Sequence, residues 1–519
     1  MEEQRQGHIC QCLRRISRIR LDSPFTIFGN RTKTGLQFVE GVQSLALGLS
    51  NLGLKPGHVV AIAALNSDIY LEWMLAVAYI GAIISPLNYR WSLEEARSAL
   101  EILEPEMLVV DDSCAIWYFE LQTYNSLRWH VCLGDPLPFV NHSDNGGLDQ
   151  VLTTGTLKSV LQTSASLDYQ WAPEGIVLIC FTSGTSGRPK GVAIGHTALI
   201  VQSLAKIAVA GYSEEDVYLH TAPLCHIGGI SSGLAMLMVG ACHVLLPKFV
   251  SGSVLQAIEQ YHVSSLITVP AMMADLISYI RSRATWKKGK SMTETCSSLT
   301  FMTLNQIQCI GFKGHPQKIS EVKPDWDNQL GVCVGKPAPH VELFVNGNGH
   351  CSIGRILTRG PHVMLKYWNQ VPLKKLDSLH QGWLDTGDIG WLDDKGAVWL
   401  IGRSNDRIKS GGENVYPEEV EAVLSQHPGV YSIAVVGVPD ARLSEMVVAC
   451  VQLQEGWKWV GHDSQSPERM DLQLTTNILY EYCKENKMTR YSFFPTLSTS
   501  YNKTLCEIIK YKNSPAAIY

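Results

Sequence analysis

One stretch of eleven residues, from Phe181 to Gly191, constrains the fold of this chain more than any other. It reads Phe-Thr-Ser-Gly-Thr-Ser-Gly-Arg-Pro-Lys-Gly, and it follows an apolar, β-branched run with the length of a buried strand. Glycine lets backbone N–H groups approach an anion closely, hydroxyls add short-range donors, and Arg188 and Lys190 add positive charge. The stretch therefore predicts a phosphate-binding loop that begins where a buried strand ends.

This loop differs from a Walker A loop, because Lys190 is followed by Gly191 rather than by serine or threonine. The alternative is a mobile turn rich in serine and glycine, without a ligand. The preceding strand and the basic tail favour the phosphate loop. We expect phosphate contacts from Thr182, Ser183, Gly184, Thr185, Ser186, Gly187 and Lys190.

The loop string TSGTSGRPKG resembles that of the acyl-adenylate-forming (AMP-binding) superfamily, which includes acyl-CoA synthetases, firefly luciferase and the adenylation domains of peptide synthetases. The resemblance covers residues 24–452 and is closest to the plant 2-succinylbenzoate–CoA ligases of phylloquinone synthesis. It implies an acid–thiol ligase that forms an acyl-adenylate and diphosphate, then acyl-CoA and AMP. The resemblance also implies that the protein uses ATP, Mg²⁺ and coenzyme A. The substrate could also be another aromatic or medium-chain acid, and the resemblance suggests the chloroplast or the peroxisome as the location.

Bulk composition narrows the class of protein. A chain of 519 residues is too long for one core, so two or more domains are expected. The net charge is −5, and 18% of the residues are charged. The basic residues form no continuous stripe, which argues against nucleic-acid binding. The 14 cysteines contain no CxxC pair, so we expect no disulfide framework or zinc site and a reducing, intracellular compartment.

Two apolar runs, residues 73–87 and 229–246, fall below the ~20 residues of a spanning helix. We expect them to be core segments, with no transmembrane helix. The first twenty residues contain no apolar h-region, and no clear targeting signal is expected. Nothing in the sequence indicates an oligomeric state.

Helical and strand patterns alternate through residues 24–170, for example helix 34–52, strand 59–63, helix 68–80 and strand 82–85. Such alternation predicts an α/β fold with doubly wound, mostly parallel sheets. Ser92 and Glu95 have the spacing of a capping box, and residues 331–368 have the pattern of a small β-subdomain. We expect a large domain at 1–401, hinged to a small α+β domain at 402–519 with helices at 418–426 and 472–486.

His226 lies in the turn Thr-Ala-Pro-Leu-Cys-His-Ile-Gly-Gly. A lone histidine near glycines is commonly a turn or core residue. The resemblance instead implies that His226 lines the acid pocket near the reacting carboxylate. The strand expected at 265–270 would form one wall of that pocket.

Thr293 and Glu294 place a hydroxyl beside a carboxylate, which suits a metal–nucleotide site. The same pair also occurs at ordinary helix starts. The resemblance implies that Thr293 contacts a phosphate and that Glu294 holds Mg²⁺.

Asp388 ends the string Gly-Trp-Leu-Asp-Thr-Gly-Asp, and a carboxylate can accept two hydrogen bonds from a ribose diol. An Asx turn is the alternative. Residues 399–417 resemble the hinge motif of the superfamily, although a charged surface loop would read similarly. The resemblance implies that Arg403 reaches ribose or phosphate oxygens. It also implies a hinge at Asn405 and nucleotide or CoA contacts from Lys409, Gly411 and Gly412.

The chain departs from the superfamily at two places. Between Trp286 and Met292 it has five residues where the family has a strand-helix-strand unit and an adenine wall. After Trp457 it lacks the terminal glycine-lysine turn, and Lys503 is not assigned that role. A truncated isoform with impaired or no activity is therefore the alternative to an active ligase.

Overall fold

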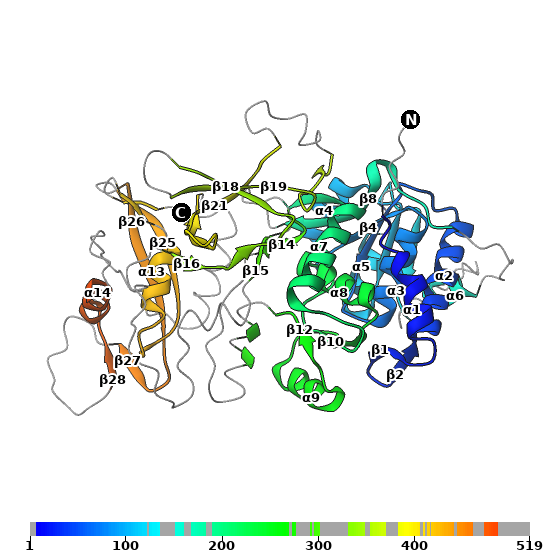
Figure 1. The fold of residues 1–519 in the computed structure, drawn as a ribbon, viewed down its shortest axis with the longest axis horizontal. Coiled ribbons are helices and arrows are strands. Elements are labelled where there is room, and N and C mark those ends of the chain that lie inside the picture. The colour runs from blue at the N-terminus through cyan, green and yellow to red at the C-terminus, as the bar shows by residue number, and fades with distance from the viewer. Residues whose placement is uncertain are drawn as a thin grey trace.

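The computed structural model describes residues 7–121, 124–134, 151–159, 168–182, 189–268, 272–273, 275–276, 291–292, 295–301, 331–347, 353–369, 382–404, 408–410, 413–415, 417–440, 444–459 and 472–485. Figure 1 shows a large helix-rich part, coloured blue to green, and a C-terminal part in orange. Antiparallel strands in yellow-green lie between these two parts. This is the α/β architecture that the sequence predicts.

An eight-stranded sheet forms the centre of the large part, in the order β20-β9-β8-β4-β3-β5-β6-β7. The strands from β8 to β7 pair in parallel, whereas β8 with β9 and β9 with β20 pair antiparallel. The doubly wound prediction is confirmed for the parallel strands. Their bounds are β3 (Val59–Ala63), β4 (Ile83–Pro86), β5 (Met107–Val110), β6 (Trp129–Cys132), β7 (Leu152–Thr153), β8 (Ile176–Thr182), β9 (Lys190–Gly195) and β20 (Lys366–Tyr367).

Both faces of this sheet are buried, because alternate residues of one strand enter different cores. In β3, Val60 and Ile62 belong to one hydrophobic cluster, and Val59, Ala61 and Ala63 belong to another. Helices cover both faces. The helices of this part are α1 (Gln11–Ile19), α2 (Gly35–Leu52), α3 (Asp68–Tyr79), α4 (Leu93–Leu103), α5 (Ala115–Glu120), α6 (Thr154–Lys158), α7 (His196–Ala210) and α8 (Ile227–Val239), with short 3₁₀ turns η1 (Asp112–Cys114) and η3 (Pro173–Gly175). A further helix, α9 (Ser251–Tyr261), packs instead against Leu219 and Val244 of a second sheet.

Local sequence signals set several helix ends. Ser92 and Glu95 form the predicted capping box before α4: the Glu95 N–H donates to Ser92 Oγ (3.3 Å), and the Ser92 N–H donates to Glu95 Oε2 (2.8 Å). Thr34 and Gln37 form a second such box before α2. The two long apolar runs become α3 with β4 and α8 with β11, and no described helix is long and apolar enough to cross a membrane.

A second sheet has the order β12-β10-β11-β1-β2, parallel except for the β1–β2 hairpin. Its strands are β1 (Pro24–Phe28), β2 (Arg31–Thr34), β10 (Val217–His220), β11 (Cys242–Leu245) and β12 (Ser265–Leu266). Within the described residues, β12 is an outer edge and stops after two residues of the strand predicted at 265–270, whose last two residues lie outside the description. Residues 287–290, at the expected deletion, lie outside it too.

A β-subdomain is present as predicted, as an antiparallel sheet in the order β16-β22-β21-β19-β18, but its bounds differ from the predicted 331–368: it includes residues 384–403, and residues 366–367 pair with β9 of the large sheet instead. Its strands are β16 (Val332–Cys333), β18 (Glu342–Asn346), β19 (Gly354–Arg359), β21 (Leu384–Leu392) and β22 (Val398–Arg403). Two-residue strand pairs lie near it: β13 (Ser291–Met292) with β14 (Ser297–Ser298), and β15 (Thr300–Phe301) with β17 (Lys336–Pro337).

The C-terminal part has its own hydrophobic core and combines helices with strands, as an α+β unit does. Its sheet has the order β24-β23-β26-β25. The elements are β23 (Ile408–Ser410), β24 (Glu413–Val415), α13 (Pro417–Leu424), β25 (Val430–Asp440), β26 (Ser444–Leu453), β27 (Trp457–Trp459), β28 (Leu472–Leu474) and α14 (Thr476–Glu485). The helix predicted at 472–486 was wrong at its start, because residues 472–474 pair with β27 instead.

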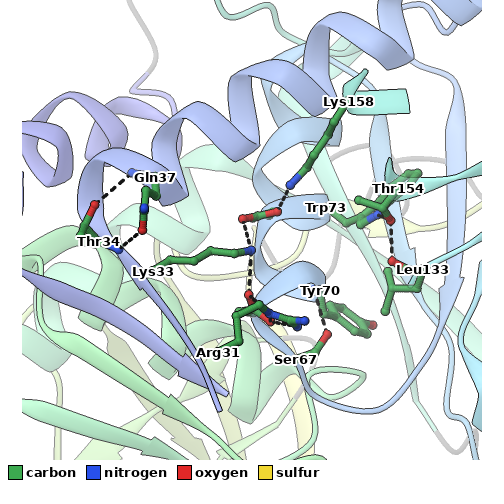
Figure 2. Close-up of polar contacts among 12 residues, drawn as sticks. Arg31, Lys33, Thr34, Gln37, Ser67, Tyr70, Trp73, Leu133, Thr154 and Lys158 are labelled. Carbon is green, nitrogen blue, oxygen red and sulfur yellow. Dashed lines mark hydrogen bonds and ion pairs between the residues drawn. The ribbon is translucent and has the colours of Figure 1, made fainter. Parts of the chain in front are cut away.

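A buried cluster of charges ties β2 to α3 and α6. Glu72 has no exposed side-chain surface and is paired with Lys33 (2.6 Å) and with Lys158. Asp68, one turn earlier, is paired with Arg31 and with Lys33 (2.7 Å). Figure 2 shows Lys33 and Lys158 extending from two elements toward the same carboxylate group, that of Glu72. Each carboxylate is therefore compensated, as a buried charge must be.

We predict that Glu72→Gln destabilises the fold by about 3 kcal/mol, because it leaves the Lys158 ammonium without its partner. Chemical denaturation measures the loss. Glu101→Gln on the exposed side of α4 is the matched control, with an expected change within ~0.5 kcal/mol. An equal loss in both variants would contradict the assigned role of the cluster.

Candidate active site

The predicted phosphate loop connects β8 to β9 as a hairpin. Thr182 lies opposite Lys190 in the antiparallel register, and Phe181 lies opposite Gly191. The two ends of the loop are thereby held side by side, where β8 ends and β9 begins. Ser183, Gly184, Thr185, Ser186 and Gly187 lie outside the described residues, so their phosphate contacts stay a prediction.

Gly191 lies at the base of this hairpin, where a side chain would be crowded. A Cβ atom there would lie 3.0 Å from Ile179 Cγ2 and 3.3 Å from Trp368 Cβ, tighter than ordinary packing. The Trp368 N–H also donates to the Gly191 carbonyl at 2.6 Å. The glycine therefore lets another segment of the chain pack against the end of the loop.

His226 stands directly before α8, as its N-cap residue. The residue is exposed, but the protein packed around the ring lowers the pKa of the imidazole below its ordinary value, and the positive charge of Arg90 lowers it further. His226 is thus neutral at neutral pH. A neutral imidazole has one nitrogen that donates a hydrogen bond and one that accepts, so it can bind an acid substrate without adding a charge.

The turn that carries His226 is held by Asn66, a residue that the sequence analysis missed. The buried Asn66 amide donates from Nδ2 to the Ala222 carbonyl (3.1 Å), and its Oδ1 accepts from the Leu224 N–H (2.8 Å). The sequence shows only an asparagine shortly after a predicted buried strand. That position does not identify the residues to which the side chain would bond.

Asp388 and Arg403 are brought together by strand register. They lie opposite each other on β21 and β22, and Arg403 Nε is 3.7 Å from Asp388 Oδ1. The Asp388 side chain is 5% exposed, whereas that of Arg403 is 54% exposed. The carboxylate is therefore fixed within the sheet, while the guanidinium extends toward solvent, where it can reach an anionic ligand.

The turn before Asp388 is fixed by its neighbours. The Gly387 N–H donates to Asp385 Oδ1 (2.8 Å), and the Thr386 hydroxyl donates to the Ile356 carbonyl (2.7 Å). The bond from the Gly387 N–H to the Asp385 carboxylate has the pattern of an Asx turn, so Asp385 forms such a turn.

The hinge motif begins where β22 ends. The Ser404 N–H donates to the Gly387 carbonyl at 2.8 Å, which keeps the chain beside the turn of Asp388. Asn405, Gly411 and Gly412 lie outside the described residues, and Lys409 lies on β23. The hinge and CoA contacts stay predictions, as does the domain boundary after residue 401, which falls within β22.

Thr293 and Glu294 also lie outside the described residues, between β13 and Thr295. In the part that the structure describes, no group of three or more ligating side chains could hold a metal ion. Mg²⁺ needs no such group, since one or two carboxylates together with nucleotide phosphates commonly bind it. The chemistry of Glu294 therefore fits a magnesium–nucleotide ligand.

Lys206 of α7 is an unexpected buried cation beside this motif. Its ammonium donates to Ser231 Oγ (2.9 Å), Ser232 Oγ (3.0 Å) and Ser297 Oγ (3.3 Å), and the residue is 4% exposed. Burial lowers the pKa of Lys206 to about 8. The sequence contained the signal, because residues 198, 199, 202, 203 and 206 recur at helical spacing on the buried face of α7.

Both parts of the chain match a family of known proteins. The family profile of AMP-binding enzymes matches residues 13–304, and the profile of their C-terminal domain matches residues 419–490. The first match alone spans more than half of the chain.

Curated relatives cover nearly the whole chain. The 2-succinylbenzoate–CoA ligase (chloroplastic/peroxisomal) of Arabidopsis thaliana is 48% identical over 531 residues, which cover 94% of this chain and 92% of that protein. The indoleacetate–CoA ligase of Aromatoleum aromaticum is 31% identical over 83% of this chain and 85% of its own. A solved structure, the o-succinylbenzoate coenzyme A synthetase of Bacillus subtilis in complex with ATP and magnesium ion, has a TM-score of 0.71 at 23% identity, with 94% of both chains covered. That structure supports the fold.

We predict that Asn66→Ala lowers the free energy of unfolding by about 1–3 kcal/mol, because a buried N–H and a buried carbonyl lose their partners. If the turn forms part of the acid pocket, the KM for the acid rises as well. Urea denaturation and steady-state kinetics measure the two effects. The control is Asn125→Ala at an exposed position, and an Asn66 variant that matched this control would refute the assignment.

Lys206 gives a pH-dependent prediction. Its pKa is about 8 in the folded chain against 10.5 in the unfolded chain, so between these pH values the unfolded state binds more protons. Stability of the wild type should therefore rise relative to Lys206→Met across this interval, by on the order of 3 kcal/mol. Denaturation curves at several pH values measure the difference. A constant difference from pH 7 to pH 10.5 would contradict the lowered pKa.

Proposed function

The chain belongs to the AMP-binding enzyme family, and from that premise we propose that it is an ATP-dependent acid–CoA ligase. A carboxylic acid and ATP give an acyl-adenylate and diphosphate, and coenzyme A then displaces AMP to give the acyl-CoA. The observation that carries the proposal is the 48% identity to the plant 2-succinylbenzoate–CoA ligase over 94% of this chain. The proposed acid is accordingly 2-succinylbenzoate.

The roles of the site residues follow from charge and geometry. Asp388, fixed on β21, would accept hydrogen bonds from both ribose hydroxyls of the nucleotide. Arg403, largely exposed beside it, would donate to the α-phosphate through its planar fork. Thr182 and Lys190 would contact the phosphates from the two ends of the loop. Thr293 would add a hydroxyl, and Glu294 would hold Mg²⁺.

The cations of the site would reduce the electrostatic repulsion between the two anionic substrates. An acid carboxylate has to approach the α-phosphorus of an anionic nucleotide, and like charges ~4 Å apart repel by about 4 kcal/mol at an effective dielectric of 20. Lys190 and Arg403 reduce this repulsion, and Mg²⁺, when bound, supplies further positive charge. His226, being neutral at pH 7, would orient the acid through hydrogen bonds.

The second step needs coenzyme A to reach the adenylate. We assign this access to the hinge at Asn405, where rotation of the small domain would exchange the residues that face the site. Lys409, Gly411 and Gly412 would then contact nucleotide or coenzyme A.

The location and the pathway rest on the relative. The name of the Arabidopsis thaliana protein includes "chloroplastic/peroxisomal", which supports either organelle for this chain. Phylloquinone synthesis follows from the resemblance to the plant enzymes, and the partners would be three small molecules: the acid, ATP and coenzyme A.

One observation favours a second candidate, an isoform with impaired or no ligase activity. The alignment with the plant relative spans 531 positions, more than the 519 residues of this chain, so it contains gaps on this side. Such gaps agree with a segment lost near residues 287–291. Sequencing of the message across the codons for Lys290 and Ser291 tests whether a longer form exists.

We predict that the purified protein catalyses pyrophosphate exchange that depends on 2-succinylbenzoate and Mg²⁺, and more slowly with indoleacetate. Magnesium-dependent AMP binding without exchange for any acid would favour the inactive isoform. Absence of any ATP or AMP binding would refute both candidates.

We further predict that Asp388→Asn weakens AMP binding roughly tenfold, because one acceptor of the ribose diol becomes a donor. Calorimetric titration with AMP measures the affinity. Asp394→Asn, at an exposed position in the turn between β21 and β22, serves as the control and should bind AMP like the wild type. Unchanged affinity in both variants would remove Asp388 from the nucleotide site.

A further inference from the structure

The lysine at the end of the phosphate loop rests on an aromatic ring. Lys190 Nζ lies 5.3 Å from the centroid of the Tyr367 ring, within the range of a cation–π contact. Tyr367 is far from the loop in sequence and belongs to β20 (Lys366–Tyr367), which the sequence analysis left without a chemical role.

Strand register produces this contact. Tyr367 lies opposite Val192 on β9, and Lys190 is two residues before Val192 on the same face of that strand. Lys190 and Tyr367 are therefore diagonal neighbours, which long side chains can bridge. On the other side of β9, Thr182 of β8 lies opposite Lys190.

The backbone that carries the Tyr367 ring is fixed independently of the lysine. The Trp368 N–H donates to the Gly191 carbonyl (2.6 Å), and the Leu365 N–H donates to the Ala193 carbonyl (3.0 Å). Lys366 is paired with Glu174 at 2.8 Å. Backbone bonds on both sides of Tyr367 thus hold β20 against β9, and the ion pair beside it joins β20 to the 3₁₀ turn η3.

Lys190 has no carboxylate partner among the residues that the structure describes, since no ion pair there includes it. A lysine side chain loses up to about 2 kcal/mol of rotamer freedom when it is immobilised. A ring that already restricts the lysine side chain reduces the entropy cost that nucleotide binding has to offset. This effect is preorganisation.

We propose that Tyr367 is a positioning residue, which holds the Lys190 ammonium at the mouth of the phosphate loop for the polyphosphate of ATP. The inference rests on the proposed function, because it assumes that the loop binds ATP. It adds a residue of the β-subdomain segment to the nucleotide site of the large domain, and it gives β20 a role besides extending the sheet.

The test compares two variants of Tyr367 in the full chain. Tyr367→Leu removes the aromatic face and should weaken ATP binding about two- to fivefold, the factor that corresponds to an exposed cation–π contact. Tyr367→Phe keeps the ring and should bind ATP nearly as the wild type does. Calorimetric titration with Mg-ATP measures Kd, and thermal unfolding monitors the fold. Tyr79→Leu on α3, another tyrosine half-buried against its neighbours, is the control for nonspecific loosening and should leave Kd unchanged.

A double-mutant cycle separates positioning from a merely structural role. If Tyr367 acts through Lys190, then Tyr367→Leu has no further effect on the Kd for ATP in a Lys190→Met background. Equal losses in both backgrounds would overturn the inference, and so would a wild-type Kd in Tyr367→Leu.

Failure of the inference and failure of the proposed function are distinguishable. If ATP binds but no acid supports pyrophosphate exchange, the ligase proposal fails, and the cycle still decides the role of Tyr367. If exchange proceeds and Tyr367→Leu leaves Kd unchanged, only the positioning role fails. Absence of ATP binding overturns both.

Discussion

The antiparallel pairing of β8 with β9 fixes where the glycine- and hydroxyl-rich loop begins and ends. β8 is buried on both faces and pairs in parallel with β4, so its end is fixed within the doubly wound sheet. β9 holds Lys190 opposite Thr182, and β20 closes its other edge. A loop whose two ends are held side by side can present N–H groups and hydroxyls to an anion without ordering its own entry and exit, which lowers the entropy cost of binding.

Charged side chains occur in three different environments in this chain. In the ion cluster of β2, α3 and α6, Glu72 and Asp68 are buried, and each has basic partners. Lys206, by contrast, is surrounded by serine hydroxyls, and burial lowers its pKa. The site cations differ again: Arg403 is half-exposed, so its charge remains available to a ligand. Partial exposure of this kind suits a site that has to bind and release anionic nucleotides.

Family membership and local departure coexist in the chain. Similarity to the plant ligase extends over almost its whole length, and Asp388 and Arg403, the residues proposed to bind the nucleotide, lie opposite each other on β21 and β22. In the described residues the second sheet ends at β12, and residues 287–290, where the sequence departs from the superfamily, lie outside them. An interior strand pairs on both of its edges, so the expected loss of one would affect the sheet as well as the adenine wall.

The sequence by itself determined the elements and strings whose signals are local: the buried strand before the loop, the capping box of Ser92 and Glu95, and the alternation that predicts parallel sheets. The superfamily strings also located Asp388 and Arg403. Only the tertiary structure decided which residues meet: Asn66 with the turn of His226, Tyr367 with Lys190, and Lys206 with its three serines. Helical period and turn chemistry act over a few residues, whereas strand register and burial join segments far apart in sequence, and no local pattern encodes those partners.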